Sequence, residues 1–212
     1  MSSHSSLLVD IGGTNMRYAY ANKKDISDEK ILSNISDENI TSTLNDLLSN
    51  PQIKNTVIAA AGPRLGNKIK MTNRKVIIDG DFLGRKFKLS NSQVLNDWEA
   101  VGYAVDEMAL KQIKRGKSES NVDLMIGPGT GLGFAIVSDG KVIPTEIGNT
   151  KLHSKLLLKN LGIKPSKSFA VLEDVISGPG ISRAYQSRYK KKLSPEEIVL
   201  LAKKRNPKAK FI

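Results

Sequence analysis

Four glycines alternate through a seven-residue stretch, Gly127-Pro-Gly-Thr-Gly-Leu-Gly133, between two apolar runs. Because glycine lacks a side chain, this spacing exposes backbone N–H groups to a bulky anion such as a phosphate. The stretch is not a P-loop, since no Gly-Lys-Ser/Thr follows, and it lacks the Gly-x-Gly-x-x-Gly spacing of a dinucleotide site. We predict a phosphate-binding turn centred on Gly129, Thr130 and Gly131.

A second glycine turn, Asp10-Ile-Gly-Gly-Thr-Asn15, lies between two apolar runs near the N-terminus. Gly12 and Gly13 allow a positive φ and close approach of an anion, and Thr14 adds a hydroxyl donor. Arg17 adds positive charge, and Asp10 could hold the water shell of Mg²⁺, which takes one or two carboxylates plus phosphate oxygens. A plain hairpin turn is the alternative. One such turn in each half of the chain is the arrangement of a nucleotide clamped between two domains.

Asp97 stands between the apolar pair Val94-Leu95 and an amphipathic pattern over residues 98–110. A carboxylate in this place can accept a proton from a substrate hydroxyl. It can equally cap the helix that follows, which is a common role of aspartate at such a junction. The residues alone leave both roles open.

The elements that must position these residues alternate between strands and helices, which favours an α/β fold. A basic, polar loop over residues 111–121 is the predicted domain boundary, and the strand–glycine turn–strand pattern repeats after it. Ser194 and Pro195 predict the start of a helix that ends near Lys204. The other expected helices cover residues 39–48, 98–110 and much of the chain from 154, including 169–176; the expected strands are 7–11, 16–21, 30–35, 56–61, 68–71, 75–79, 122–126, 132–137 and 141–143.

Composition excludes several classes of protein. The 212 residues carry a net charge of +12, but almost all of the excess lies in residues 151–212, without the interleaved aromatics that would favour nucleic-acid binding. The absence of cysteine excludes a disulfide framework, a thiolate zinc site and a cysteine nucleophile. No signal-peptide pattern opens the chain, and no window approaches the roughly 20 apolar residues of a membrane span. We expect a cytoplasmic protein.

Four motifs occur in the order and rough spacing of bacterial glucokinases, which belong to the actin–hexokinase superfamily. They are Asp10-Ile-Gly-Gly-Thr-Asn-Met-Arg17, Asn96-Asp-Trp-Glu-Ala100, the stretch from Gly127 to Gly133, and Glu173-Asp-Val-Ile-Ser-Gly-Pro-Gly180. The resemblance implies a two-domain actin/hexokinase-like (ribonuclease H-like) α/β fold with mixed sheets. It implies a small N-terminal domain over residues 1–110 and a partial large domain over 111–212. Family members continue well past this point, so the second domain is expected to be incomplete.

The resemblance also implies an activity, the ATP-dependent phosphorylation of glucose at its 6-hydroxyl, which is the first step of glycolysis. Asp97 would be the base, and ATP with Mg²⁺ the phosphoryl donor. Residues matching the family's sugar contacts are Asn73, Asn96, Glu146, Asn149 and Glu173. Residues matching its nucleotide contacts are Asp10, Gly12, Gly13, Thr14, Asn15, Arg17, Gly129, Thr130 and Gly131, with Asp10 reaching Mg²⁺ through water.

One departure from the family bears on the substrate. The usual Glu-Gly-Gly-His is Glu146-Ile-Gly-Asn149 here, and an asparagine can bond a hydroxyl but cannot carry a positive charge. A kinase for another hexose is therefore one alternative, and a sugar- and nucleotide-binding relative without turnover is a second. A regulatory relative of the repressor–kinase type is a third, and the lack of cysteine argues against its zinc motif. A homodimer remains open.

Overall fold

The structure is a computed structural model that describes residues 5–23, 25–72, 74–117 and 121–211. The chain divides into two compact units, Met1–Ile113 and Lys114–Ile212, and each is described by itself. Both combine strands with helices, so the predicted α/β class is confirmed. No helix among the described residues is long and apolar enough to cross a membrane.

The first unit is built on a five-stranded mixed sheet with the strand order β3-β2-β1-β4-β8. β1 pairs antiparallel with β2 and parallel with β4, and β8 continues the sheet parallel to β4. The predicted pair of strands around the first glycine turn is therefore confirmed, and β3 is shorter than expected. The strands are β1 Ser6–Ile11, β2 Met16–Ala21, β3 Lys30–Leu32, β4 Asn55–Ala60 and β8 Asn91–Asn96.

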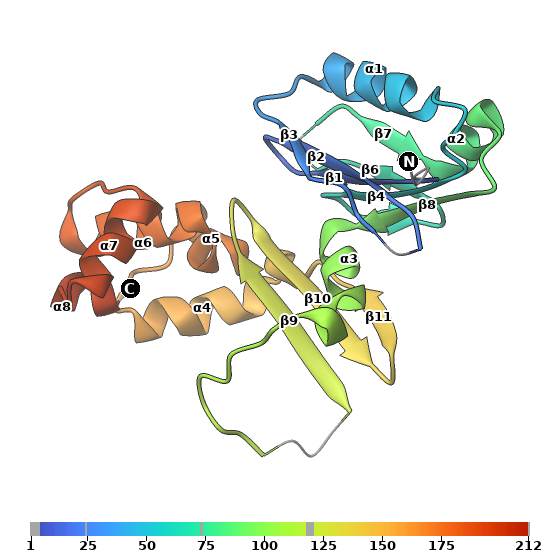
Figure 1. Cartoon of the computed structure of the whole chain (residues 1–212). Coiled ribbons are helices and arrows are strands. Elements are labelled where there is room, and N and C mark those ends of the chain that lie inside the picture. Colours follow the sequence, from blue (N-terminus) through green and yellow to red (C-terminus); the bar gives the residue numbers. More distant parts are fainter. Residues whose placement is uncertain (1–4, 24, 73, 118–120, 212) are drawn as a thin grey trace. The chain divides into compact units, whose positions relative to one another are not determined.

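Helix α1, Asp37–Leu48, packs its apolar stripe against one face of this sheet (Figure 1). It begins after Ser36, whose Oγ accepts a hydrogen bond from the Asn39 N–H at 3.2 Å. Ile40, Leu44 and Leu48 are buried at helical spacing and join the alternate buried residues of β1 in one core. The helix starts two residues before the predicted residue 39, because the cap lies at Ser36.

A three-stranded antiparallel sheet and a short helix complete the first unit. The strands are β5 Arg64–Leu65, β6 Lys68–Lys70 and β7 Ile77–Asp79, and the helix is α2 Gly80–Phe87. The predicted hairpin over residues 68–79 is present, whereas β5 and α2 were not predicted. Helix α2 is closed by Asp79 at its start and by Lys88 in the left-handed conformation at its end.

The helix predicted over residues 98–110 is shorter than the pattern indicated. Helix α3 covers Asp97–Tyr103, a 3₁₀ turn follows at Val105–Glu107, and the backbone is extended at Met108. Leu110 and Ile113 are 73% and 95% exposed. Apolar residues stabilise a helix by packing against a neighbour, and these two have no core to cover, so the helix does not extend through them.

The second unit has a three-stranded antiparallel sheet in the order β11-β10-β9, whose longest hairpin is drawn in yellow in Figure 1. The strands are β9 Val122–Pro128, β10 Leu132–Ser138 and β11 Lys141–Pro144, as the repeated pattern predicted. Helices follow, with the predicted capping of α7 at Ser194 confirmed. They are α4 Lys151–Asn160, α5 Glu173–Ile176, α6 Gly178–Tyr189, α7 Pro195–Lys203 and α8 Pro207–Phe211.

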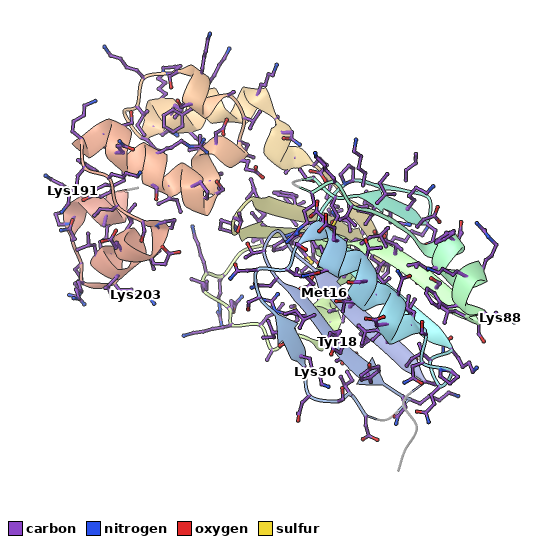
Figure 2. All side chains as sticks on the ribbon, turned by 90° about the horizontal axis from the view of Figure 1, so that it is seen from above. Met16, Tyr18, Lys30, Lys88, Lys191 and Lys203 are labelled. Atoms are coloured by element: carbon purple, nitrogen blue, oxygen red, sulfur yellow. The ribbon has the colours of Figure 1, made fainter. Side chains whose placement is uncertain are left out.

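The helices of the second unit are short and enclose two small apolar clusters, one around Leu158 and Phe169 and one around Tyr185 and Ile198. Of the predicted helix over residues 169–176, only α5 and a 3₁₀ turn at Lys167–Phe169 form. Figure 2 shows side chains of this unit, among them Lys191 and Lys203, directed away from the helices, and both residues are exposed. This part of the positive charge is therefore solvated.

Candidate active site

Asp10 and Asp97 lie at the same edge of the five-stranded sheet. The register places Asp10 of β1 level with Ala59 of β4, and Ala59 level with Leu95 of β8. Since β1, β4 and β8 are parallel, their carboxyl ends meet at one edge, and Asp97 follows directly after β8. Neighbouring strands are about 4.8 Å apart, so the two carboxylates come from strands about 10 Å apart.

Asn96 caps helix α3, and Asp97 is its first residue. The Asn96 Oδ1 accepts hydrogen bonds from the N–H groups of Trp98 at 2.9 Å and Glu99 at 3.2 Å. Its Nδ2 donates to the Gly62 carbonyl at 2.9 Å. The alternative that Asp97 is the N-cap of this helix is therefore wrong, because Asn96 is the N-cap. Asn96 was predicted to contact sugar, but it is buried with both ends of its amide bonded within the first unit.

The Asp97 carboxylate is half-buried and accepts a hydrogen bond from the Trp98 N–H at 3.0 Å. Burial raises the pKa of Asp97 above its usual range, and the negative charge of Asp10 raises it further. Hydrogen bonds from Trp98 and Asn96 act in the opposite direction on this pKa. A partly desolvated carboxylate with a raised pKa, placed at the end of a strand, has the character of a general base.

Asp10 forms an ion pair with Arg17 across the β1–β2 ladder, with 3.0 Å between Asp10 Oδ2 and Arg17 Nη1. The two side chains are 43% and 42% exposed, so the pair faces solvent at the sheet edge. No group of three or more metal-ligating side chains lies among the described residues. A single carboxylate still fits Mg²⁺ that arrives with a nucleotide, because phosphate and water supply the remaining ligands.

The first glycine turn, residues 12–15, is closed by a hydrogen bond from the Gly12 N–H to the Asn15 carbonyl at 2.9 Å. The expected positive φ is absent at Gly12 and Gly13, so these glycines are not required by left-handed backbone. A side chain at Gly13 would meet no described atom within 4 Å. Gly13 and Thr14 are exposed, and this leaves one side of the turn open to a ligand.

The second glycine turn lies against Glu173 in the second unit. The Leu132 N–H donates to Glu173 Oε2 at 2.7 Å, and a Cβ on Gly131 would come within 2.8 Å of that same oxygen. The Gly129 N–H donates to the Gly131 carbonyl at 2.8 Å, which makes the turn compact. Thr130 and Gly129 are exposed at its tip.

Glu146 precedes a 3₁₀ turn, Ile147–Asn149, which ends at Asn149 and packs against the same place. Gly148 is buried there, and a Cβ on it would lie 3.3 Å from the Leu132 carbonyl and 3.5 Å from Glu173 Cβ. Glu146 and Asn149 are both exposed. The structure thus brings the two predicted glutamates, Asn149 and the second glycine turn together within one unit.

The predicted site residues fall into one group in each unit, and Asn73 lies outside the described residues. Three residues near the first group were missed. Glu99 pairs with Arg64, and Arg74 donates to the carbonyl of Gly13 at 2.8 Å and to Asp37 at 3.0 Å. Glu99 could have been found from the capping-box spacing Asn-x-x-Glu, whereas no sequence signal marks the two arginines.

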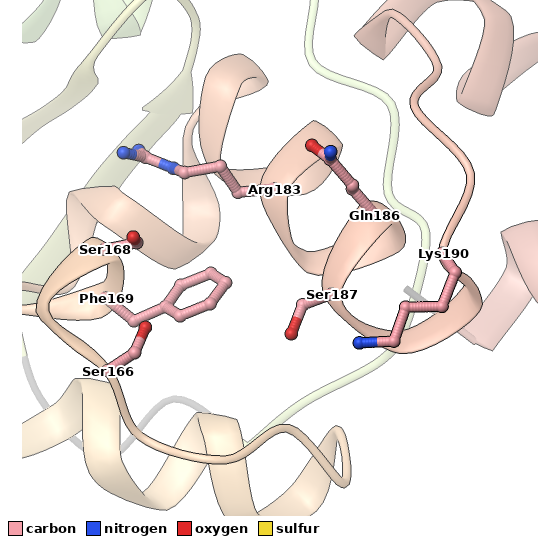
Figure 3. A pocket seen from close by; sticks show the side chains of 7 residues that line it. All are labelled: Ser166, Ser168, Phe169, Arg183, Gln186, Ser187 and Lys190. Atoms are coloured by element: carbon pink, nitrogen blue, oxygen red, sulfur yellow. The ribbon is translucent and has the colours of Figure 1, made fainter.

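A pocket of about 400 Å³ lies elsewhere in the second unit, between the loop that carries Ser166 and Phe169 and helix α6 (Figure 3). Ser187 and Lys190 line its α6 side together with Arg183. Arg183 is paired with Asp174 at 3.2 Å, so the charge of its guanidinium is already balanced. None of the predicted site residues is among those that line this pocket.

Comparison with known proteins gives a family match over nearly the whole chain. The sequence profile of the family described as Glucokinase matches residues 7–210. A curated relative is a glucokinase-like protein of Xylella fastidiosa (strain Temecula1), 29% identical over 203 residues. The alignment covers 86% of this chain and 61% of the relative, so the chain spans less than two thirds of the relative's length.

Solved structures agree with the family match. A glucokinase from an Antarctic psychrotroph is 27% identical, with a TM-score of 0.67 over 96% of this chain and 72% of that one. A ROK family glucokinase from Streptomyces griseus, solved in complex with glucose and AMPPNP, is 17% identical with a TM-score of 0.60 over 96% and 72% of the two chains. The second likeness shows the fold alone, and both agree with the expected hexokinase-like architecture.

Proposed function

The chain belongs to the glucokinase family, and on that premise we propose that it transfers the γ-phosphoryl group of MgATP to the 6-hydroxyl of glucose. The products would be glucose 6-phosphate and ADP, in the first step of glycolysis in the cytoplasm. The whole reaction is a proposal, because the chain spans 61% of the length of a curated relative. The observation that carries it is the half-buried Asp97 carboxylate, whose pKa is raised by burial, at the sheet edge that also holds Asp10.

In this proposal Asp97 accepts the proton of the 6-hydroxyl while the oxygen of that hydroxyl forms a bond to the γ-phosphorus. The bond between that phosphorus and its bridging oxygen breaks, and ADP leaves. Phosphoryl transfer depends mainly on position and on neutralised charge, so the remaining residues bind rather than react. Asn96 holds Asp97 in place through the α3 cap.

The groups around Asp97 would hold the two substrates. Asp10 would hold the water shell of the Mg²⁺ that accompanies ATP, and Arg17 next to it would balance its charge. The first glycine turn, including Thr14 and Asn15, would face phosphate. The family match over residues 7–210 supports this pair of substrates.

The second unit would supply the remaining contacts. Glu146, Glu173 and Asn149 would accept or donate hydrogen bonds to sugar hydroxyls, as would Asn73 of the first unit. Gly129, Thr130 and Gly131 would approach the phosphates. Here the first unit corresponds to the small domain and the second to part of the large domain.

The test is turnover of Asp97→Asn against the wild-type chain with glucose and MgATP, measured by coupled detection of ADP. General-base catalysis contributes about 10²- to 10⁴-fold, and we expect a loss of kcat of that order. Glucose binding should persist, because asparagine keeps the hydrogen-bonding shape of the side chain. Undiminished turnover in Asp97→Asn contradicts the proposed base, and glucose binding without turnover in the wild-type chain favours a binding protein.

A second candidate is a kinase for a different hexose, and Asn149 favours it. Its exposed amide offers a neutral donor and acceptor where the related enzymes carry a titratable imidazole. Comparison of kcat/KM across glucose and its epimers decides between the two candidates. We expect Asn149→His to change the preference toward glucose by about 10-fold, the scale of one altered hydrogen bond to a substrate. An unchanged order of preference in Asn149→His removes Asn149 as its cause.

A further inference from the structure

Glu99 is a carboxylate in the interior of the first unit for which the proposed chemistry has no use. It lies two residues after Asp97 and its side chain is 1% exposed. Arg64 of β5 binds it in two places, with Nε at 2.8 Å from Oε2 and Nη2 at 2.7 Å from Oε1. The third nitrogen of the guanidinium donates to the Gly66 carbonyl at 2.8 Å.

The same carboxylate reaches back to the residue before Asp97. The Asn96 N–H donates to Glu99 Oε2 at 3.2 Å, and the Asn96 side chain accepts the Glu99 N–H at 3.2 Å. Asn96 also donates to the Gly62 carbonyl, two residues before Arg64. Two connections, Asn96 to Gly62 and Glu99 to Arg64, therefore hold the junction of β8 and α3 against the segment 62–64 that follows β4. Asp97 lies between Asn96 and Glu99.

The turn after β4 packs closely against β6. Gly62 has φ of 154°, and a Cβ on it would come within 2.4 Å of the Lys70 carbonyl, so only glycine fits there. Arg64 pairs with Ile69 of β6, so the segment that makes both connections lies against β6. Asp97 is oriented from outside its own helix.

Stability alone does not account for an ion pair whose carboxylate is 1% exposed and whose arginine side chain is 29% exposed. Two well-packed apolar residues in place of such a pair are often as stable, because the pair must first lose its hydration. A helix cap of this type also needs no charge, since glutamine serves as well as glutamate. What the charged, two-point contact adds is a fixed geometry.

We propose that Arg64 and Glu99 are positioning residues that hold the Asp97 carboxylate in the direction required for proton transfer. The inference rests on the proposed function, because this direction matters only if Asp97 receives a proton from a substrate. Small errors in the placement of a catalytic group can cost about 10²-fold in rate. The pair would act on kcat through Asp97 without touching sugar or nucleotide.

Trp98 supplies a measure of this geometry that is independent of activity. It is the only tryptophan of the chain and lies between Asp97 and Glu99. The residue is half-buried, and its backbone N–H donates to the side chains of both Asn96 and Asp97. Its emission wavelength and its quenching by acrylamide therefore report on the junction that Arg64 and Glu99 hold.

Three variants separate positioning from stability. Arg64→Met combined with Glu99→Leu removes the pair but leaves apolar side chains that preserve the fold. Glu99→Gln keeps the hydrogen bond to Asn96 and loses only the charge. Lys68→Gln is the matched control, since it removes another ion pair of the first unit. In that pair, on the β6–β7 hairpin, the Lys68 Nζ lies 2.7 Å from the Asp79 Oδ2.

For the double variant we expect kcat to fall by about 10- to 100-fold, with little change in KM for glucose or in Tm. Trp98 should become more accessible to acrylamide and its emission should move to longer wavelength. Glu99→Gln should lose less activity than the double variant, because the hydrogen bond from the Asn96 N–H to the side chain at position 99 remains. Lys68→Gln should match the wild type in kcat and in Trp98 quenching.

The inference is overturned if the double variant keeps wild-type kcat and wild-type Trp98 quenching. It is also overturned if kcat and Tm fall together in both the double variant and Glu99→Gln, because the pair would then only stabilise the fold. If the double variant does not fold, Glu99→Gln decides by the same criteria. If the wild-type chain transfers no phosphoryl group, the proposed function fails, and Trp98 quenching alone decides whether the pair orders this junction.

Discussion

At the scale of single residues, Asp97 is held in an environment that opposes its charge. Burial is the larger cause of its raised pKa, and the charge of Asp10 is the smaller one. The Arg17 guanidinium pairs with Asp10 and also with Glu29, and Arg64 pairs with Glu99, so both cations already have carboxylate partners. A side chain whose charged form is disfavoured in the folded protein reduces stability whenever it is ionised.

We therefore predict that Asp97→Asn raises Tm at neutral pH. The pKa of Asp97 is higher in the folded than in the unfolded protein. The destabilisation caused by its charge is therefore absent when the pH is below the unfolded pKa of about 3.9, and it is complete when the pH is above the folded pKa. The gain in Tm should accordingly be present at pH 7 and vanish as the pH falls below 4. Asparagine can still accept the Trp98 N–H, so the hydrogen bond at this position is retained.

Thermal unfolding of both proteins across this pH range measures the effect. Asp106→Asn is the control, since Asp106 is an exposed carboxylate of the same unit. A gain that is equal at pH 4 and pH 7, or an equal gain in Asp106→Asn, would show that burial of the Asp97 charge is not its cause.

At the scale of structural elements, the second glycine turn and helix α5 depend on each other. Glu173, the first residue of α5, receives the Leu132 N–H just after the turn, and Gly178 at the start of α6 donates to the Gly129 carbonyl at 2.8 Å. The turn therefore fixes the Glu173 carboxylate, which we propose binds sugar. Only the absence of a side chain at Gly131 leaves room for that carboxylate.

We predict that Gly131→Ala displaces the Glu173 carboxylate, because the new Cβ would come within 2.8 Å of its Oε2. Loss of a charged hydrogen bond to substrate costs about 1.5–3 kcal/mol, so KM for glucose should rise by about 10- to 100-fold. Gly129→Ala is the steric control for the fold, since its Cβ meets no described atom within 4 Å. Equal KM values in wild type and Gly131→Ala would separate Glu173 from sugar binding.

Local patterns gave most of the strands and the location of both glycine turns. The alternation in β1 and the glycine spacing before β10 are written in consecutive residues, so they were predictable. The end of α3 was not, because it depends on whether Leu110 and Ile113 find a core. Helix α2 was missed because eight residues with two glycines give a weak periodic signal.

The residues that hold the candidate site were harder to predict than the residues expected to act in it. Asp97, Glu173 and the glycines belong to contiguous motifs. Arg64 reaches Glu99 across 35 positions, and Arg74 reaches Gly13 across 61. Contacts of this range follow from the sheet topology, and a single sequence carries no local signal for them.

At the scale of the whole molecule, β9 presents an apolar edge. It pairs with β10 alone among the described strands, and Val122, Leu124 and Ile126 are 46%, 60% and 54% exposed along one of its faces. An exposed edge strand with an apolar face can pair with another chain.

We predict that the wild-type chain self-associates as its concentration rises, and that Leu124→Lys combined with Ile126→Lys reduces this association. Sedimentation velocity across a concentration series measures it. Leu65→Lys is the control, because Leu65 is 86% exposed but lies in the two-residue strand β5 of the other unit. A wild-type chain that stays monomeric throughout, or equal suppression by Leu65→Lys, contradicts a role for β9.

The segment from Met108 to Lys117 joins two bodies that each contain their own apolar clusters, and it has neither helix nor strand. It carries Lys111, Lys114, Arg115 and Lys117, all exposed and all substrates for trypsin. Proteases cut preferentially at exposed, irregular backbone. Brief digestion should therefore divide the polypeptide here first and release two fragments, so that the half that carries Asp97 and the half that carries Glu146 and Glu173 can be purified and recombined.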